Sequence, residues 1–348
     1  MAIRLHTLTP RGQTPLDVAR EVAAFLAGAR RSLELALYDV RLPDPAGAVV
    51  AGALREAAAR GVSVRIAYNE DHGKDLPVPP PPRTRPDILA ELPCELAAIP
   101  GTPDLMHHKY AVRDGEAILT GSTNWTEDSW SLQENVMLTV DSSPLAASFG
   151  ANFEELWRTR DVERTGRIEP EPVKIGGVEV RPWFTPGHGP ELSHRIARAI
   201  GHARERVRVA SPVLTAAPVL STLAQVVADG RLDVAGVVDA TQVDQVVHQW
   251  RENGQSAWKV PVFAAVLGRG GFAGKRSTPW GRDTPHDFMH AKVTVADDVV
   301  FAGSFNLSHS GEQNAENVLE AGDPDLADRL AGFVDEVRAA YPVASVPG

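Results

Sequence analysis

Two stretches of the chain, residues 3–40 and 178–214, share one pattern of apolar and polar positions. Each begins with alternating apolar and polar residues, which is the period of a half-buried strand, and then turns at a Thr-Pro pair. A segment with apolar residues spaced near 3.6 follows, ends at basic residues and leads into a second apolar strand. Each stretch therefore predicts a strand, a helix and another strand.

The repeat continues beyond these stretches. Residues 62–69 match residues 232–239, and residues 95–100 match residues 262–267, so each half has further predicted strands. The order strand, helix, strand, helix, strand is typical of an α/β sandwich. We predict two similar halves, residues 1–166 and 167–348, with the boundary in the polar stretch 161–177.

Two segments interrupt the repeat. Residues 75–86 are rich in proline, which indicates a stiff surface loop. Residues 268–288 are rich in glycine and basic residues and come just before a group of polar residues described next. Long loops in compact domains often carry function, so we predict that residues 268–288 line a site.

The repeat also duplicates a set of polar residues with matched spacing. Each half contains H-x-K-x4-D, then G-S-x-N, then E-N with its glutamate ten residues after the asparagine. The first motif spans residues 107–114 and the second spans residues 290–297. The first set is His107, Lys109, Asp114, Ser122, Asn124 and Glu134, and the second is His290, Lys292, Asp297, Ser304, Asn306 and Glu316. Six lysines in the whole chain make two chance copies of H-x-K improbable.

These residue types suit phosphodiester chemistry. Alternation along a strand puts the His and Lys of each motif on one face, and two such strands meeting across a dyad would gather them around one cavity. Lys109 and Lys292 supply positive charge to a phosphorane-like state, and the side chains of Ser122, Asn124, Ser304 and Asn306 supply neutral donors. One histidine attacks phosphorus, and the other protonates the leaving alkoxide and then activates water or an alcohol. Glu134 and Glu316 are the candidates to orient the rings.

With this paired pattern, the sequence resembles the phospholipase D superfamily, and the resemblance covers both halves. It implies two α/β/α sandwich halves related by pseudo-twofold symmetry, with a single active site where the motifs meet. It favours His107 as the nucleophile and His290 as the general acid. The near-symmetry of the sequence leaves that assignment open.

Other residues near the motifs have a structural interpretation. Asp114 and Asp297 close a strand, so we expect them to fix the turn. His108 faces the other side of the predicted strand, which favours packing. Aromatic residues also lie near the motifs, and we expect most to be core and one or two to line the entrance: Trp125, Trp130, Trp280 and Phe288.

A metal site is not expected. His286 and His290 are four residues apart, as in a helical zinc pair, but Pro285 opposes a helix there. The single cysteine, Cys94, excludes an intramolecular disulfide and a cysteine cluster. We therefore predict no metal and no other cofactor.

Composition narrows the class of protein. The chain has 348 residues, 43% hydrophobic and 23% charged, as in globular proteins. Its net charge of −10 opposes non-specific binding to nucleic acid or to an anionic membrane. We see no export signal and no uninterrupted apolar run long enough for a transmembrane segment, so we expect a cytoplasmic location.

The pattern is specific about the reaction and less so about the substrate. We favour a phospholipid, hydrolysed or transferred, and keep an endonuclease or nucleotide phosphodiesterase acting on single-stranded nucleic acid or nucleotides as the alternative. Four basic residues near the second motif support that alternative: Arg269, Lys275, Arg276 and Arg282. A non-enzymatic domain is disfavoured because no motif residue is missing. A lipid substrate implies peripheral membrane contact, and a monomer suffices for the site.

Overall fold

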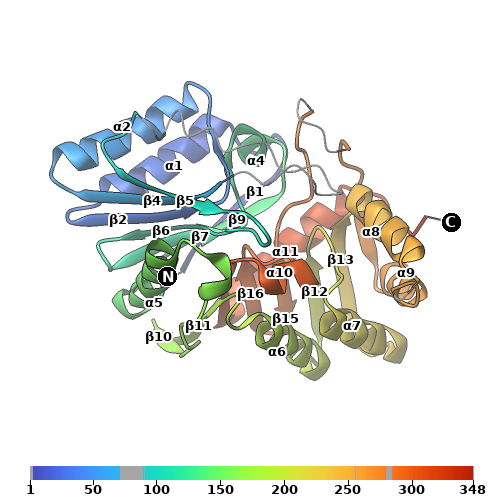
Figure 1. The fold of residues 1–348 in the computed structure, drawn as a ribbon. Coiled ribbons are helices and arrows are strands. Elements are labelled where there is room, and N and C mark those ends of the chain that lie inside the picture. Colours follow the sequence, from blue (N-terminus) through green and yellow to red (C-terminus); the bar gives the residue numbers. More distant parts are fainter. Residues whose placement is uncertain (1–2, 71–88, 90, 255, 280–283, 348) are drawn as a thin grey trace.

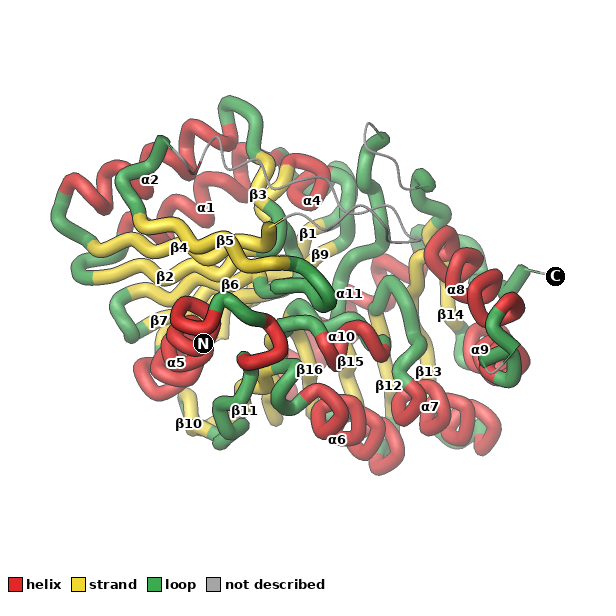
Figure 2. The backbone as a smooth tube through the Cα atoms, viewed as in Figure 1, coloured by secondary structure: helices red, strands yellow, loops and turns green. Residues whose placement is uncertain are grey.

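The structure is a computed structural model, which describes residues 3–347 apart from 71–88, 90, 255 and 280–283. Two large β-sheets, each covered by helices on both faces, make up the molecule (Figure 1). The smooth backbone trace in Figure 2 shows the strands of each sheet with helices above and below. Of the helices in these residues, none has the length and apolar character needed to cross a bilayer.

The first sheet has seven strands. In spatial order they are β1 (Ile3–Leu8), β9 (Asn135–Asp141), β7 (Ala117–Gly121), β6 (Lys109–Arg113), β2 (Ser32–Leu37), β4 (Ser63–Glu70) and β5 (Glu95–Pro100). Helices α1 (Pro15–Ala27) and α2 (Ala46–Ala59) pack on one face, and α5 (Ser143–Thr159) packs on the other. Shorter elements complete this half: β3 (Val40–Arg41), β8 (Trp125–Thr126), α4 (Glu127–Ser131) and η1 (Val162–Arg164).

The second sheet has eight strands. In spatial order they are β10 (Val173–Ile175), β11 (Val178–Phe184), β17 (Asn317–Gly322), β16 (Val299–Gly303), β15 (Val293–Ala296), β12 (Arg206–Ala210), β13 (Asp233–Asp239) and β14 (Phe272–Lys275). One face is covered by α6 (Gly189–His202), α7 (Ala217–Asp229), α8 (Ala240–Glu252) and α9 (Lys259–Arg269). Helix α11 (Pro324–Ala339) covers the other face, and the short helix α10 (His309–Gln313) lies in the connection between β16 and β17.

The two sheets repeat one topology, as the sequence pattern predicts. From β11 onwards, the second sheet follows the strand order of the first, and β2–β4 and β12–β13 are the corresponding parallel pairs. One strand prediction is wrong. Residues 262–267 lie inside helix α9, and the strand equivalent to β5 is β14. A short apolar run fits either a strand or a buried helix, so its period alone does not decide.

Each half ends in a helix that joins the other half. Helix α5 begins after Ser142, whose hydroxyl accepts from the N–H of Leu145, and α11 begins after Asp323, which caps Leu326 in the same way. Helix α5 contacts β11, and α11 contacts β1. Their apolar faces belong to one buried cluster that contains residues of both sheets. The halves therefore share a core, which fixes their relative position at the seam.

Candidate active site

The two motif histidines lie at the seam, each just before a strand. Lys109 is the first residue of β6 and Lys292 immediately precedes β15, so His107 and His290 stand outside the regular sheet. The alternation that we expected along a regular strand therefore does not extend to the two histidines, which lie just before the strands begin. All four side chains are nevertheless buried or nearly so, and they point into the same region.

A polar residue at the end of a neighbouring strand holds each histidine segment. The N–H of Met106 donates to the side-chain oxygen of Asn69 at 3.0 Å, and the N–H of Met289 donates to Asp239 at 3.0 Å. Asn69 and Asp239 stand at equivalent ends of β4 and β13. Sequence reasoning missed both anchors, although a polar residue ending an otherwise buried strand at matched positions was a usable signal.

Backbone pairing brings each histidine segment to the opposite half. Met106 forms a bridge with Ala315, and Met289 forms a bridge with Glu134. The residue before each histidine therefore lies beside the start of the E-N pair of the other half, opposite the residue before the glutamate in one case and opposite the glutamate itself in the other. This crossing gathers the two motifs into one site.

His107 is oriented by a carboxylate from the other half. Its Nδ1 lies 2.8 Å from Oε2 of Glu316, which is fully buried. Burial and the ammonium groups of Lys109 and Lys292 hold the pKa of His107 well below its ordinary value. Burial raises the pKa of Glu316 to about 8, against the two lysines, which lower it. A charged Glu316 fixes the proton on Nδ1 and leaves Nε2 with a free lone pair.

His290 is oriented by an amide instead. Its Nδ1 lies 3.1 Å from Oδ1 of Asn135, which also accepts from the hydroxyl of Ser122 at 2.7 Å. Burial and the nearby ammonium of Lys292 hold the pKa of His290 well below its ordinary value. Because the amide oxygen can only accept, it too places the proton on Nδ1.

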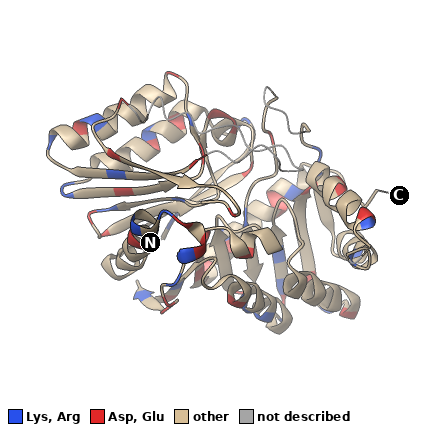
Figure 3. Cartoon of the chain, in the orientation of Figure 1, with Lys and Arg blue, Asp and Glu red and all other residues tan. Residues whose placement is uncertain are grey.

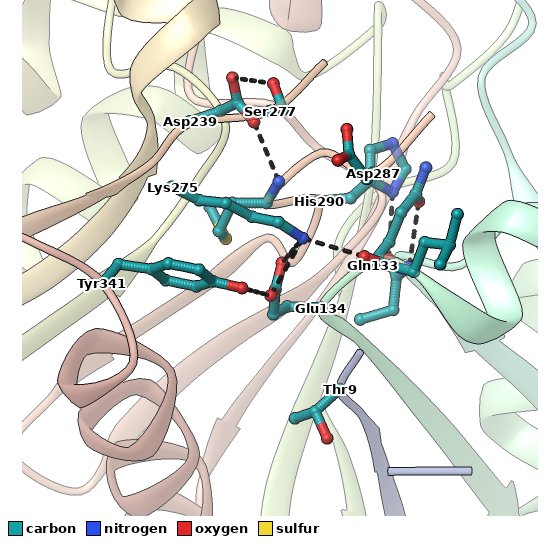
Figure 4. A network of polar contacts seen from close by, with 12 residues as sticks. Thr9, Gln133, Glu134, Asp239, Lys275, Ser277, Asp287, His290 and Tyr341 are labelled. Carbon is teal, nitrogen blue, oxygen red and sulfur yellow. Dashed lines mark hydrogen bonds and ion pairs between the residues drawn. The ribbon is translucent and has the colours of Figure 1, made fainter. Parts of the chain in front are cut away.

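Glu134 does not orient His290, contrary to the expectation from sequence. Its carboxylate is bound by the ammonium of Lys275 at 2.9 Å and by the hydroxyl of Tyr341 (Figure 4). Within the described part of the chain, no hydrogen bond joins Glu134 to His290. The physical reason is that a buried carboxylate takes the buried cation available to it.

The two motif lysines flank the histidines. Nζ of Lys109 donates to the carbonyl of His107 at 2.6 Å, and Nζ of Lys292 donates to the carbonyl of His290 at 2.6 Å. Burial lowers the pKa of Lys109 to about 7, and burial together with Lys109 holds the pKa of Lys292 well below its ordinary value. An entering phosphate would stabilise both charged forms, so the pair is tuned to bind an anion.

The asparagines and serines of G-S-x-N have different places. Asn124 and Asn306 line the cavity, where their side-chain N–H groups can donate to a phosphate oxygen, whereas their buried amide oxygens have no hydrogen-bond partner among the described residues. The serines do not line it: Ser122 accepts from the N–H of Val136 at 3.0 Å, and Ser304 makes the same bond to β17. Our expectation that the serine hydroxyls contact phosphate is therefore corrected, because strand backbone engages them.

The glycines before these serines are required by close strand approach. A Cβ on Gly121 would lie 2.1 Å from the carbonyl of Val136, and a Cβ on Gly303 would lie 2.1 Å from that of Asn317. Gly121 also has a positive φ of 149°. Only glycine lets β7 and β16 turn here and leave Asn124 and Asn306 facing the cavity.

Asp114 and Asp297 act as clamps away from the cavity. The Asp114 carboxylate accepts from the N–H groups of residues 30–32, and the Asp297 carboxylate accepts from those of residues 204–206. Both residues have a left-handed backbone, with φ of 58° and 51°. Each clamp ties the turn after the motif strand to the start of the adjacent strand, β2 or β12, which agrees with a structural role.

The histidines open onto a cavity of about 320 Å³ between the halves. Several amides and hydroxyls line it, although apolar atoms contribute most of its wall surface. The walls include one ion pair, in which Nε of Arg41 donates to Asp39 at 3.0 Å. The lining also includes Tyr38, Leu105, Thr126, Gln133, Pro212, Thr241, Gln242, Gln245, His286 and Phe288. This volume lies at the lower end of the range of small-molecule binding pockets.

The segment 268–288, predicted to line a site, reaches the cavity near its end, at His286 and Phe288. Strand β14 lies inside the segment 268–288, and Phe288, stacked on the ring of His286, lines the cavity. Trp125 and Trp130 are core residues. Trp280, Arg282 and the proline-rich segment 75–86 lie outside the described residues. In the residues that are described, no three His, Cys, Asp or Glu side chains form a metal-binding group.

The geometry supports two-step transfer at phosphorus. Two neutral imidazoles, each with a proton fixed on Nδ1, open onto a common cavity that Asn124 and Asn306 also line. The buried ammonium groups of Lys109 and Lys292 lie close enough to both rings to lower the pKa of each histidine. One ring can attack phosphorus while the other, once protonated on Nε2, serves the leaving oxygen. These features define a phosphodiesterase with one site built from both halves of a repeated fold.

Comparison with known proteins agrees with this class. The sequence matches the family described as "Cardiolipin synthase, PLD-like domain" over residues 22–157 and 196–337. Similar curated proteins are the mitochondrial cardiolipin hydrolases of Xenopus laevis (34% identical, covering 44% of this chain and 70% of that protein) and Homo sapiens (29% identical, 42% and 53%). The chain spans 60%, 59% and 53% of the length of the corresponding proteins of Xenopus tropicalis, Chlamydomonas reinhardtii and human.

Solved structures show the same fold over nearly the whole chain. Phosphatidylserine synthase of Haemophilus influenzae superposes with a TM-score of 0.68 at 12% identity, covering 98% of this chain and 87% of that one. Polyphosphate kinase of Porphyromonas gingivalis gives 0.56 at 13% identity, covering 96% and 50%. The chain belongs to the phospholipase D superfamily, as the matched residues in both halves show.

Proposed function

We propose that this protein cleaves the phosphodiester of a glycerophospholipid and passes the phosphatidyl group to water or an alcohol through a phosphohistidine. The observation that carries this proposal is the pair of oriented histidines facing one cavity between two buried lysines. The names of the curated relatives, which are cardiolipin hydrolases, support a lipid substrate.

In the first step, His107 is the nucleophile. Nε2 of His107 bonds to phosphorus, and the bond from phosphorus to the leaving oxygen breaks. The imidazole becomes positively charged when it carries the phosphoryl group, and the carboxylate of Glu316, 2.8 Å from Nδ1, stabilises that charge. An amide would do so less well, which favours His107 over His290 for this role.

His290 moves protons in both steps. Protonated on Nε2, it donates that proton to the leaving alkoxide. It then takes a proton from water or an acceptor alcohol, whose oxygen bonds to phosphorus as the bond to His107 breaks. Asn135 holds the ring in position without a full negative charge, so the imidazolium of His290 remains a good proton donor.

The basic residues favour a lipid over nucleic acid. Lys275 is buried and bound to Glu134, and Arg276 pairs with Asp244, so two of the four residues that suggested a nucleic-acid contact are already neutralised. Acidic and basic residues are interspersed over both halves in Figure 3. Binding of a nucleic-acid backbone depends on an excess of cations along its path.

The test is to offer phosphatidylcholine vesicles, cardiolipin vesicles and single-stranded DNA in parallel, with excess EDTA in a second set. We expect phosphatidic acid from lipid and phosphatidylethanol as well when a few per cent ethanol is present, since alcohol and water compete for one intermediate. His107→Asn is the control for contaminating activity. DNA cleavage without lipid turnover would overturn the lipid assignment and leave the mechanism standing.

A further inference from the structure

The E-N pairs of the two halves make different contacts although their spacing is the same. On the second-half side, Glu316 binds His107 at 2.8 Å and the next residue, Asn317, binds the next residue of the motif, His108, at 3.3 Å. Two consecutive side chains of β17 and its approach therefore hold two consecutive residues of the opposite motif.

On the first-half side this pairing moves by one residue. The residue equivalent to His108 is Ala291, whose side chain has no polar atom to offer Asn135. Asn135 binds His290 instead, at 3.1 Å, and its amide nitrogen donates to Gln133 and to the carbonyl of Ser129. Glu134 is thereby left without a histidine partner.

Glu134 is held by a separate buried network. The ammonium of Lys275 lies 2.9 Å and 3.1 Å from its two oxygens and also donates to the carbonyl of Leu132 at 2.9 Å. The hydroxyl of Tyr341 donates to the same carboxylate (Figure 4). Glu134 is 1% exposed and Lys275 6%, so this pair is shielded from solvent. It fixes residues 132–134, which lead directly to Asn135.

His108 is equally well buried. Its ring lies edge-on to Tyr110 and Phe184, with centroids 5.0 Å and 6.4 Å away. Burial lowers the pKa of His108 to about 3, so the ring is neutral and can donate from Nδ1. The amide nitrogen of Asn317 donates to Thr120 at 2.6 Å, which turns the amide oxygen towards His108.

We propose that His108 and the Lys275–Tyr341 pair are positioning residues that make the two catalytic histidines unequal. His108 holds the amide oxygen of Asn317 in a hydrogen bond, so that of this E-N pair Glu316 alone faces His107. Lys275 and Tyr341 bind the carboxylate of Glu134, so that of this E-N pair Asn135 alone faces His290. This inference rests on the proposed two-histidine function and adds the residues that assign each histidine its role.

His108 and the Lys275–Tyr341 pair act on different steps of the reaction. Loss of His108 frees Asn317 to compete with Glu316 for Nδ1 of His107, which slows formation of the phosphohistidine. Loss of the Lys275 network loosens the approach to Asn135 and so disturbs His290. When the leaving group is weakly basic, His290 matters mainly for hydrolysis of the intermediate.

The experiment follows bis(p-nitrophenyl) phosphate by rapid mixing. Its leaving group departs without a general acid, so the burst of nitrophenolate reports attack by His107 and the later linear phase reports hydrolysis. For His108→Ala we expect the burst rate to fall about tenfold, as is typical when a supporting residue is lost, with KM within about twofold. Phe149→Leu, in the same aromatic cluster but remote from Asn317, is the matched packing control.

The second variant is Glu134→Gln combined with Lys275→Met. Lys275→Met alone would leave a buried carboxylate unpaired and could prevent folding, whereas the double variant removes both charges together. We expect an unchanged burst rate and a linear phase slowed about tenfold. The pH profile of the linear phase should also shift, which a loss of stability alone would not produce. Tyr341→Phe should give the same change with smaller amplitude.

The outcomes separate the two proposals. Equal slowing of both phases in either variant, or His108→Ala behaving like Phe149→Leu, would overturn the positioning role. A wild-type protein that turns over the diester without a burst, and with no phosphate on either histidine, would instead overturn the two-histidine function itself.

Discussion

His107 and His290 occupy equivalent places in a repeated fold, yet their surroundings differ. A carboxylate lies behind His107 and an amide lies behind His290. A carboxylate stabilises the charge of a ring bonded to phosphorus, whereas an amide keeps the imidazolium acidic enough to give up its proton. The comparison teaches that two motifs with the same His, Lys and Asp residues can acquire separate roles through single residues beside them, such as His108 in one copy and Ala291 in the other.

The largest expected effect is loss of either histidine. His107→Asn or His290→Asn should reduce kcat on a lipid by about 10⁴-fold or more, because nucleophile and acid act as a unit. Thermal unfolding should remain cooperative, since both rings line a cavity. A variant of either residue with near-normal kcat would show that the halves do not share one site.

The next effect comes from exchanging the groups behind the rings. Glu316→Gln gives His107 an amide, and we expect kcat to fall by about 10²–10⁴-fold as the charge behind the nucleophile is lost. Asn135→Asp gives His290 a carboxylate and should slow proton donation by about tenfold, because the imidazolium becomes less acidic. Initial rates with phosphatidylcholine vesicles measure both. Equal losses in the two variants would contradict unequal roles.

The pH dependence sharpens the comparison. Attack by His107 needs Glu316 charged, and its pKa of about 8 makes kcat/KM fall as pH drops below that value. Phosphate binding needs Lys109 charged, and its pKa of about 7 makes kcat/KM fall as pH rises above that value. Because the acid-side limit lies above the alkaline-side limit, the two limbs overlap, and we expect a narrow bell that peaks between pH 7 and pH 8 with only a minor fraction of the protein in the active ionisation state. A bound phosphate stabilises the ammonium, so the alkaline limb of kcat should lie at higher pH than that of kcat/KM.

Stability should respond to Glu316 in the opposite sense to activity. Its folded pKa is above the unfolded value, so the folded state holds the proton more tightly, and this contribution is lost as pH rises from about 4.5 through 8. Glu316→Gln should therefore flatten the decline of Tm between pH 5 and pH 8, measured by thermal unfolding. A parallel decline in both proteins would mean that Glu316 is charged throughout.

The smallest effect on catalysis is expected at the clamps. Asp114→Ala or Asp297→Ala removes an acceptor for three backbone N–H groups and should lower the free energy of unfolding by about 1–3 kcal/mol. Asn tolerates the left-handed backbone, so Asp114→Asn should lose less. The kcat of the folded protein should stay within about threefold of wild type, since neither aspartate lines the cavity onto which the histidines open. Chemical denaturation gives the first quantity and initial rates the second.

The repeated pattern predicted the α/β halves, the motif residues and the clamp role of the aspartates, because period and spacing are local properties of the chain. The strand at 262–267 was wrong because a six-residue apolar run does not distinguish a strand from a helix. The contacts of Ser122 and Ser304 depend on which strand lies next to them, which spacing does not show.

The partner of Glu134 was beyond sequence reasoning for a different reason. The symmetry of the motifs suggested His290, but Lys275 and Tyr341 come from positions 141 and 207 residues further along the chain. Ala291 in place of His108 was visible as a break in symmetry. Its consequence became clear only when the contacts of Asn317 and Asn135 could be compared.

The most direct test of unequal histidines is the position of the phosphorus in the covalent intermediate. Wild-type protein is mixed with bis(p-nitrophenyl) phosphate, quenched with base during the burst, digested and analysed by mass spectrometry. We predict a phosphoryl adduct on His107 and none on His290. An adduct on His290, or one divided between the two rings, would contradict it.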